Sequence, residues 1–198
     1  MGSRRRPARL MGRRTGRDRG RSIAYNGSVT AVLKAFRVES IPAAKLIGRR
    51  ISCQYGHPEG NPIGGFWGQC FGDGTIEKLQ AYPTVREPVL AFGWIGNFDD
   101  EAKTFDYLIS TLTTPDAQPF EGAVAIGLPA LGYAIGTIED TVPDLFMAAC
   151  GLVNAEIEKR GLDRNHKHRF EMEAYDERFT HDAPTTVIEF WVPLEAAL

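Results

Sequence analysis

The sequence predicts an α+β fold made of two similar halves that share one antiparallel sheet. Segments with apolar side chains at every second position alternate with two segments whose apolar side chains repeat at helical spacing. The order strand, strand, helix, strand, strand occurs twice. A short apolar-Pro-Ala segment running to a glycine also recurs, at Ile41–Gly48 and at Leu128–Gly136. Two such pseudo-symmetric ββαββ units (βαββ core) would bury two helices on one shared sheet, giving a single α+β domain with a pseudo-twofold axis.

In the first half, Ala35–Ile41 and Lys45–Cys53 are predicted to pair as strands around a Pro42-Ala43 turn. Two further strands are predicted at Val89–Phe98 and Lys103–Thr113.

The helix between these strand pairs is predicted to start at Asn61-Pro62, an N-cap residue followed by a proline. Its apolar stripe comprises Ile63, Phe66, Trp67, Cys70 and Phe71. Its interior also holds four glycines, Gly64, Gly65, Gly68 and Gly72. Because glycine is a poor helix former, contacts with the rest of the protein must hold this helix.

In the second half, Ala123–Ile126 and Tyr133–Ile138 are predicted to form the strand pair. Strands at His168–Arg178 and Thr185–Pro193 close the unit. The helix between them is predicted to be capped by Thr141 and to end at Gly161, after two basic residues. The apolar residues of its buried face are Val142, Leu145, Phe146, Ala149, Leu152, Val153 and Ile157.

The domain is predicted to span residues 31–198, with repeats at about 34–114 and 123–195, preceded by a basic tail over residues 1–30. The first 21 residues hold nine arginines and a single acid, Asp18. We interpret this segment as a disordered tail, which includes the case of a true start at Met11 or later. A nucleic-acid-binding arm is a second interpretation. An export signal is the least favoured, because no clear apolar segment follows the arginines.

The rest of the chain is acidic, with 14 basic side chains against 24 acidic ones. This balance argues against nucleic acid as a partner of the folded domain and favours cations. No apolar run approaches the roughly 20 residues that span a bilayer, so neither a membrane nor an export route is predicted and the expected location is the cytoplasm. The three cysteines have no CxxC spacing, which argues against a zinc site or a disulfide framework.

The candidate binding surface lies on the strand Phe170–Phe179. A two-residue period puts Glu171, Glu173 and Tyr175 on one face, with Phe170 and Met172 on the other. The later segment Val187–Leu194 carries Glu189 between apolar and aromatic residues. Carboxylates beside aromatic rings suit a flat, apolar, positively charged molecule, because ring faces add cation–π attraction.

The chain resembles the gyrase-inhibitor-like effector-binding domain. The matching segments are Ile41-Pro-Ala, Phe66-Trp67, Thr104-Phe-Asp-Tyr-Leu108, Leu128-Pro-Ala, Phe170–Phe179 and Phe190-Trp-Val-Pro193. The resemblance covers about Lys34 to Leu194. Domains of this family stand alone in integron cassette proteins and form the drug-sensing part of AraC-type and MerR-type transcription regulators.

The resemblance implies a central cleft between the two halves, with a glutamate on its floor that faces lipophilic cations, at the position of Glu173. It also implies that Tyr107 and Tyr175 are cleft tyrosines and that Trp67 faces the cleft from the first helix. Glu171 is the alternative acid if the register differs by two residues. For Trp67 the alternative to a place in the cleft wall is packing in the core.

Two further residues complete the candidate ligand-binding set. Phe71 follows Trp67 on the same helix stripe. Trp94, between Gly93 and Gly96, falls near the symmetric counterpart of the Glu173–Tyr175 segment, where its bulk would make the cleft chemically one-sided, although core packing is the favoured interpretation.

The leading hypothesis is a protein that binds hydrophobic, cationic small molecules such as drugs or dyes. The resemblance also leaves open an enzyme, a hydrolase of strained cyclopropane-containing natural products in which Glu173 would position or deprotonate a water. A third possibility is a regulatory role, either as a sensor domain with a separate DNA-binding partner or as a gyrase inhibitor. No metal or cofactor is predicted, because the pair His166 and His168 lacks partners at ligand spacing and the glycine-rich Gly56–Gly74 lacks a phosphate-binding motif.

Overall fold

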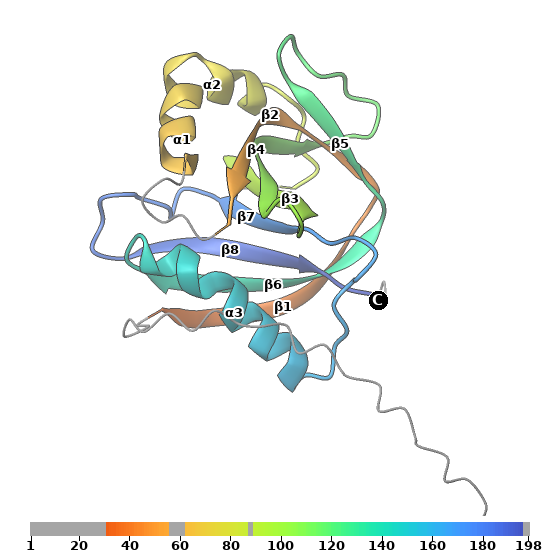
Figure 1. Cartoon of the computed structure of the whole chain (residues 1–198), viewed down its shortest axis with the longest axis vertical. Helices are drawn as coiled ribbons and strands as arrows, with labels where there is room; N and C mark the ends of the chain where they lie inside the picture. The colour runs from red at the N-terminus through yellow and green to blue at the C-terminus, as the bar shows by residue number, and fades with distance from the viewer. Residues whose placement is uncertain (1–30, 56–61, 87–88, 196–198) are drawn as a thin grey trace, which may run out of the picture.

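One antiparallel sheet of eight strands organises the computed structural model, which describes residues 31–55, 62–86 and 89–195. The strand order is β1-β6-β8-β7-β3-β4-β2-β5, and three helices complete the described part (Figure 1). This confirms the predicted α+β class with its single antiparallel sheet. The predicted tail over residues 1–30 lies outside the described residues.

The elements follow the predicted order, with one additional helix. The strands are β1 Val32–Ile41, β2 Ala44–Gln54, β3 Ala91–Asp99, β4 Thr104–Thr113, β5 Val124–Leu128, β6 Leu131–Asp140, β7 Glu171–Tyr175 and β8 Thr186–Pro193. The helices are α1 Ile63–Gly72, α2 Thr75–Gln80 and α3 Asp144–Lys159.

The two halves exchange their first strands, so the predicted pairing of neighbours around the Pro-Ala segments is wrong. β1 pairs with β6 of the second half, and β5 pairs with β2 of the first half. Ile41 lies opposite Leu131, and Leu128 lies opposite Ala44, in the same symmetric arrangement. Each Pro-Ala segment therefore carries the chain from one half of the sheet to the other.

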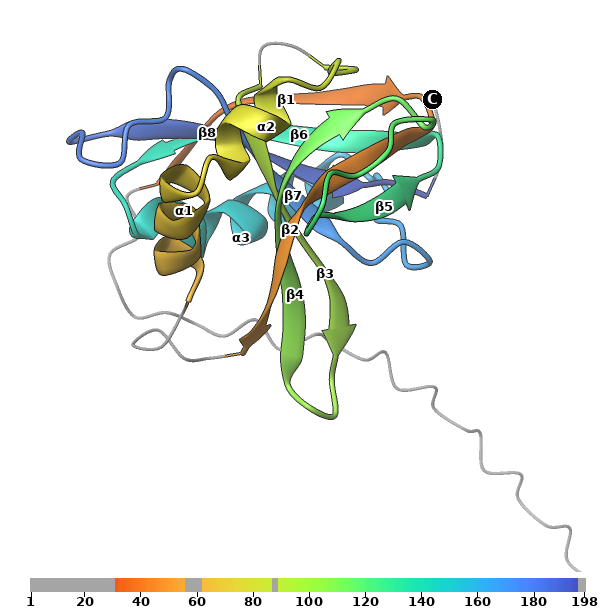
Figure 2. The same cartoon turned by 90° about the horizontal axis from the view of Figure 1, so that it is seen from above.

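The sheet is strongly bent, and both long helices lie on one of its faces, here called the helix face. Figure 2 shows β1, β6 and β8 running across the direction of β2, β3 and β4. Over the second half, α3 packs Leu145, Ala149 and Val153 against β6 and β8. Over the first half, α1 packs Phe66 and Cys70 against β2 and β4. β7 and β3 pair at the centre of the sheet, between these two clusters.

The opposite face buries a core of its own. Phe92, Trp94, Met172 and Trp191 belong to this cluster, together with Ile41 and Leu128 from near the sheet edges. Since β1 and β5 are opposite edge strands, their presence in one cluster means that the sheet curls around this core. Apolar residues therefore cover both faces of β3 and β7.

The helix ends differ from prediction for local reasons. α3 begins at Asp144, after Pro143, because a residue that precedes proline avoids the helical region; Thr141 is therefore not the cap. The predicted end is confirmed: Gly161 has φ +65° and Leu162 N donates to Ile157 O at 3.0 Å.

The short helix α2 was not predicted. Asp73 precedes it, and its Oδ1 accepts a hydrogen bond from the Thr75 backbone N–H at 3.0 Å. Ile76 and Leu79, three residues apart, are its buried apolar residues. Among the described residues, no helix is long and apolar enough to cross a membrane.

Candidate ligand-binding site

Three polar side chains from two strands meet at the centre of the helix face. Glu173 lies in the middle of β7, buried with 7% of its surface exposed. Its Oε2 accepts hydrogen bonds from Tyr107 Oη at 2.8 Å and from Tyr175 Oη at 2.7 Å. The predicted glutamate and both predicted tyrosines therefore lie in one cluster.

A glycine on the strand between them makes this cluster possible. Gly93 of β3 is directly opposite Glu173, and β3 lies between β7 and β4. A Cβ at Gly93 would lie 2.2 Å from Tyr107 Oη and 2.7 Å from Glu173 Oε2. Any side chain there would displace the hydrogen-bonded groups, so glycine is required for close approach. This role of Gly93 was not predicted, although an isolated glycine within a strand is a signal for it.

Trp67 joins the cluster from α1. Its Nε1 donates a hydrogen bond to Tyr107 Oη at 3.2 Å. Its ring makes an edge-on contact with the ring of Tyr175, with centroids 5.0 Å apart. The side chain is half-buried and contacts both helix-face clusters, whereas Phe66 and Cys70 fill the core side of α1. Trp67 thus lies over the polar cluster, between the two helices.

Further aromatic rings enclose the Tyr175 side. Phe179 packs edge-on against Tyr175 at 4.8 Å, and Phe146 of α3 lies 6.4 Å from Tyr175. Neither phenylalanine was among the predicted site residues, although Phe146 lies on the predicted stripe of α3 and Phe179 ends the predicted strand. Phe71 is 59% exposed, with its ring 6.0 Å from that of Trp67. It therefore lies at the outer margin of the aromatic group.

The two candidate acids have different surroundings, although both lie on the helix face. Glu171 accepts a hydrogen bond from Arg164 Nη2 at 2.5 Å and one from Cys150 Sγ at 3.3 Å. Glu173 has no cationic partner among the described residues. The negative charge of Glu171 is thus compensated within the protein, and that of Glu173 is not.

Burial dominates the electrostatics of Glu173. Desolvation raises the pKa of its carboxyl to about 7, the tyrosine hydrogen bonds lower it in part, and the charge of Glu171 raises it slightly. Burial, and then the charge of Glu173, raise the pKa of Tyr107 and Tyr175 well above the ordinary tyrosine value. Both hydroxyls therefore remain protonated donors, and the carboxyl is poised to ionise near neutral pH.

Trp94 and Glu189 do not join this cluster. Trp94 alternates with Gly93 along β3, so its side chain enters the core of the opposite face, where it lies near Phe170. The prediction that Trp94 lines the same site as Glu173 is therefore wrong. Arg37 binds Glu189 through two hydrogen bonds of 2.8 Å each, so Glu189 serves an internal ion pair.

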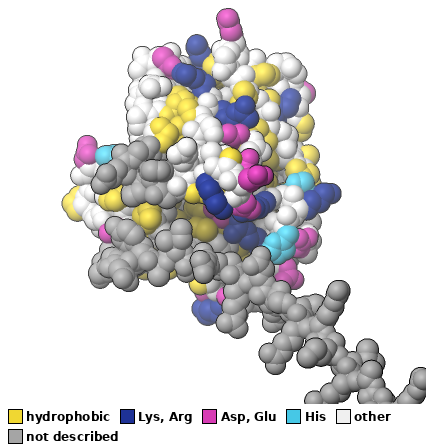
Figure 3. Space-filling model, viewed as in Figure 1, with side chains coloured by type: hydrophobic (Ala, Val, Ile, Leu, Met, Phe, Trp, Pro, Cys, Tyr) yellow, Lys and Arg dark blue, Asp and Glu magenta, His cyan; other side chains and the backbone are white. Residues whose placement is uncertain are grey.

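Charges of both signs are mixed on the visible surface. On the face drawn in Figure 3, basic and acidic side chains alternate over the described part, and no continuous basic area is visible there. Among the described residues, no group of three or more His, Cys, Asp or Glu side chains could hold a metal ion.

Comparison with known proteins supports the same assignment of fold. The family model of Cass2, the integron-associated effector-binding protein, matches residues 37–194. No curated protein sequence matches the chain.

Several solved structures share the fold at low sequence identity. SAV2435 bound to tetraphenylphosphonium is 18% identical, with a TM-score of 0.64 over 82% of this chain and 94% of that one. Integron cassette protein VCH_CASS2 from Vibrio cholerae is 14% identical, with a TM-score of 0.51 over 84% and 99%. The C-terminal domain of EcmrR, a protein also solved with DNA, is 14% identical, with a TM-score of 0.53 over 82% and 98%.

These matches confirm the resemblance to effector-binding domains that the sequence suggested. Since the family model covers most of the chain, the assignment does not rest on the central strands alone. The chain belongs to the Cass2 family of integron-associated effector-binding proteins.

Proposed function

We propose that the protein binds lipophilic cations on the helix face, with Glu173 as the counter-charge and Trp67, Tyr107 and Tyr175 as the surrounding rings. The observation that carries this proposal is a buried carboxylate without a cationic partner among the described residues. A bound cation would supply the missing charge. Binding of tetraphenylphosphonium by the similarly folded SAV2435 supports this choice of ligand class.

The energetic argument starts from the cost of ionising Glu173. Two tyrosine hydroxyls donate to one carboxylate oxygen, yet burial still holds the pKa of this group at about 7. A cation placed beside the carboxylate favours its ionised form and lowers that pKa. Part of the attraction between ligand and carboxylate is therefore gained only when the ligand carries a positive charge.

The aromatic side chains supply the remaining affinity. Trp67 and Tyr175 meet edge-on, and Phe179 and Phe146 flank Tyr175. Burial of ligand rings against these side chains contributes roughly 25 cal/mol per Å² of apolar surface. Their faces also attract a cation by about 0.5–2 kcal/mol each when water is excluded.

Ligand entry requires Trp67 to move, because Glu173 is 7% exposed beneath the aromatic group. Trp67 is carried by a ten-residue helix with four glycines, and a Cβ at each of them would meet no atom within 4 Å. Close packing thus does not require these glycines. They make α1 easy to displace, which supports a ligand-dependent opening of the site.

The test is a calorimetric titration with tetraphenylphosphonium at pH 8. Glu173→Gln keeps the size of the side chain and removes its charge, and we expect it to weaken binding at least tenfold, about 1.4 kcal/mol. Glu171→Gln is the matched control on the same strand face and should weaken binding much less. Neutral triphenylphosphine oxide should bind to wild type and to Glu173→Gln with nearly the same affinity. Equal tetraphenylphosphonium affinity in wild type and Glu173→Gln would refute the proposal.

One observation favours hydrolysis as a second candidate function. A carboxyl with a pKa of about 7 beside two tyrosine donors suits a general base that activates water at neutral pH. Turnover of a cyclopropane-containing alkylating compound by the wild type, abolished in Glu173→Gln, would support this candidate. Binding of that compound without turnover would leave ligand binding as the function.

A further inference from the structure

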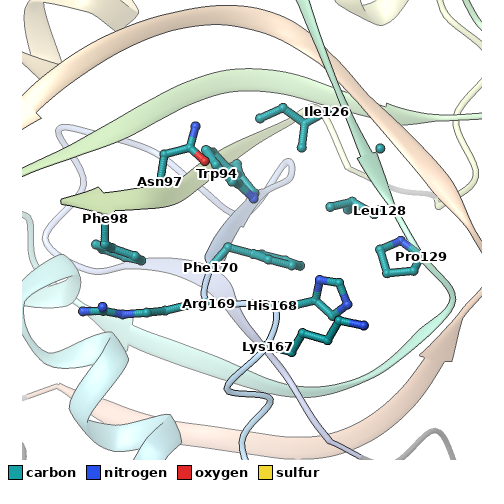
Figure 4. Close-up of a pocket in the computed structure, with 11 residues that line it drawn as sticks. Trp94, Asn97, Phe98, Ile126, Leu128, Pro129, Lys167, His168, Arg169 and Phe170 are labelled. Carbon is teal, nitrogen blue, oxygen red and sulfur yellow. The ribbon is translucent and has the colours of Figure 1, made fainter.

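A hollow lies on the other side of the sheet, away from Glu173. Its volume is about 330 Å³, within the range of small-molecule sites. Its apolar lining consists of Trp94, Phe98, Ile126, Leu128, Pro129 and Phe170. Figure 4 shows these side chains around a common space between β3, β5 and the segment that leads into β7. The hollow is thus separated from the Glu173 cluster by the thickness of the sheet.

An unpaired hydrogen-bond donor faces this hollow. Trp94 is 4% exposed, and its Nε1 is one of two buried polar side-chain atoms without a partner among the described residues. In Figure 4 the indole nitrogen is turned toward the space between Phe170 and Leu128. A buried N–H without an acceptor costs roughly 1–3 kcal/mol, so an acceptor supplied by a ligand would remove that cost.

A glycine fixes the position of this indole. Gly96 lies two residues after Trp94, on the same face of β3, and a Cβ there would come within 2.2 Å of Trp94 Cζ2. Gly93 clears space for the Glu173 cluster on the helix face, and Gly96 clears space for Trp94 on the other. Close packing therefore requires glycine at both of these positions, on either side of Trp94.

Basic side chains line one side of the hollow. Lys167, His168 and Arg169 line it, and the eleven lining residues include no carboxylate. Arg169 is paired with Asp100 at 2.8 Å, whereas the side chains of Lys167 and His168 have no hydrogen-bond or ion-pair partner among the described residues. Two basic side chains are thus free to meet an anionic group at the rim.

We infer that this hollow is a second binding site, for small aromatic or branched apolar molecules that carry a carboxylate. The apolar wall takes the ring, the Trp94 N–H donates to a carboxylate oxygen, Lys167 supplies the opposite charge, and the His168 ring offers a further hydrogen-bond donor. The preference for charge is opposite to that proposed for the Glu173 cluster. The two sites are independent, so failure of one does not decide the other.

The test follows the three indole N–H resonances by ¹H–¹⁵N NMR during titration with 2-naphthoate. We expect the Trp94 signal, assigned with Trp94→Phe, to shift saturably. The signals of Trp67 and Trp191, whose Nε1 atoms donate to Tyr107 and Glu189, should stay in place. The trimethylammonium derivative of naphthalene, with the same rings and the opposite charge, should not move the Trp94 signal.

Lys167, which is exposed, and His168, which is half-buried, provide the decisive variant, because neither belongs to the buried core. The double variant Lys167→Gln/His168→Gln should bind 2-naphthoate about fivefold more weakly. Glu173→Gln should bind it as the wild type does. A Trp94 signal that does not move, or one that moves with equal affinity in the Lys167→Gln/His168→Gln protein, would overturn the inference.

Discussion

Single residues on β3 determine which side chains can meet on each face of the sheet. Gly93 leaves room for the hydrogen bonds that join Glu173 to two tyrosines, and the adjacent Trp94 points to the opposite core. Alternation along one strand therefore separates an acid-centred cluster from a hollow with an indole donor. The central chemistry depends on a residue with no side chain as much as on the glutamate.

Replacing Gly93 tests this dependence. Gly93→Ala places a Cβ 2.2 Å from Tyr107 Oη, so we expect a loss of about 1–3 kcal/mol in the free energy of unfolding and weaker tetraphenylphosphonium binding. Urea denaturation and calorimetry measure the two effects. Gly127→Ala, at a strand glycine whose Cβ would meet nothing within 4 Å, should change stability by less than about 0.5 kcal/mol. Similar losses in both variants would contradict the explanation.

The raised pKa of Glu173 also predicts how stability depends on pH. The folded carboxyl keeps its proton up to about pH 7, whereas the unfolded one loses it near the ordinary value of 4.5. This group therefore stabilises the fold fully below pH 4.5, and that contribution is lost as the pH rises through 7. The total change is about 3 kcal/mol.

The glutamine side chain of Glu173→Gln cannot ionise, so comparison with this variant isolates the contribution of the Glu173 carboxyl to stability. The difference in free energy of unfolding between wild type and Glu173→Gln, measured in urea from pH 4 to pH 8, should shift against the wild type as the pH rises. A difference that stays constant over this range would show that Glu173 ionises normally in the folded protein.

Much of this residue-level arrangement could be predicted from the sequence. The two-residue period of Phe170–Phe179 puts Glu173 and Tyr175 on one face, and family resemblance adds Tyr107 and Trp67. Phe146 and Gly93 were missed because their roles depend on contacts between distant segments. Phe179 was missed because a local turn after β7, closed by the hydrogen bond from Phe179 N to Asp176 O, brings its ring against Tyr175. Trp94 was misplaced because the face of β3 is set by its pairing with β7.

At the scale of elements, α1 is the weakest part of the candidate site. All four of its glycines are exposed, and its buried residues are Phe66 and Cys70. Each interior glycine costs up to about 1 kcal/mol relative to alanine. The helix that carries Trp67 is therefore held mainly by two buried side chains, which suits the proposed role of α1 as a wall that moves when a ligand enters.

Gly68→Ala should stabilise this helix without touching the site. We expect a gain of about 0.5–1 kcal/mol in the free energy of unfolding, together with slower association of tetraphenylphosphonium, because opening α1 becomes harder. Stopped-flow tryptophan fluorescence measures the association rate. Faster or unchanged association in a stabilised Gly68→Ala protein would argue against α1 as the moving wall.

Strand positions were predictable to within a few residues, because alternation and helical spacing are local signals. Which strands pair with one another was not predictable in this way, because pairing depends on segments far apart in the sequence. The Pro42-Ala43 segment fits a tight turn, yet β1 and β2 pair with strands about 100 and 60 residues away along the chain. The repeated Ile41-Pro-Ala and Leu128-Pro-Ala segments indicated symmetry correctly, but not the exchange of strands.

For the whole molecule, this exchange interlocks the two halves. β1 completes the second half of the sheet, and β5 completes the first. The cluster behind β3 and β7 draws residues from both halves, including Ile41 and Leu128. Neither repeat can bury its apolar faces alone, so the protein should fold as one cooperative unit.

Separate expression of the two repeats tests this conclusion. Residues 31–116 and 117–198 alone should each lack a cooperative thermal transition, since each lacks the partner of its first strand. Mixing the two should restore near-ultraviolet circular dichroism as the exchanged strands pair. Cooperative unfolding of either fragment alone would mean that the exchange is not needed for stability.

The most direct test of the central claim is the number of protons released when tetraphenylphosphonium binds. A cation beside Glu173 should ionise a carboxyl whose pKa is about 7, releasing about 0.5 proton at pH 7 and about 0.9 at pH 6. Calorimetry in buffers of different ionisation enthalpy measures this number. The account predicts such release from the wild type and none from Glu173→Gln. Binding with no proton release, or with the same release in both proteins, would contradict it.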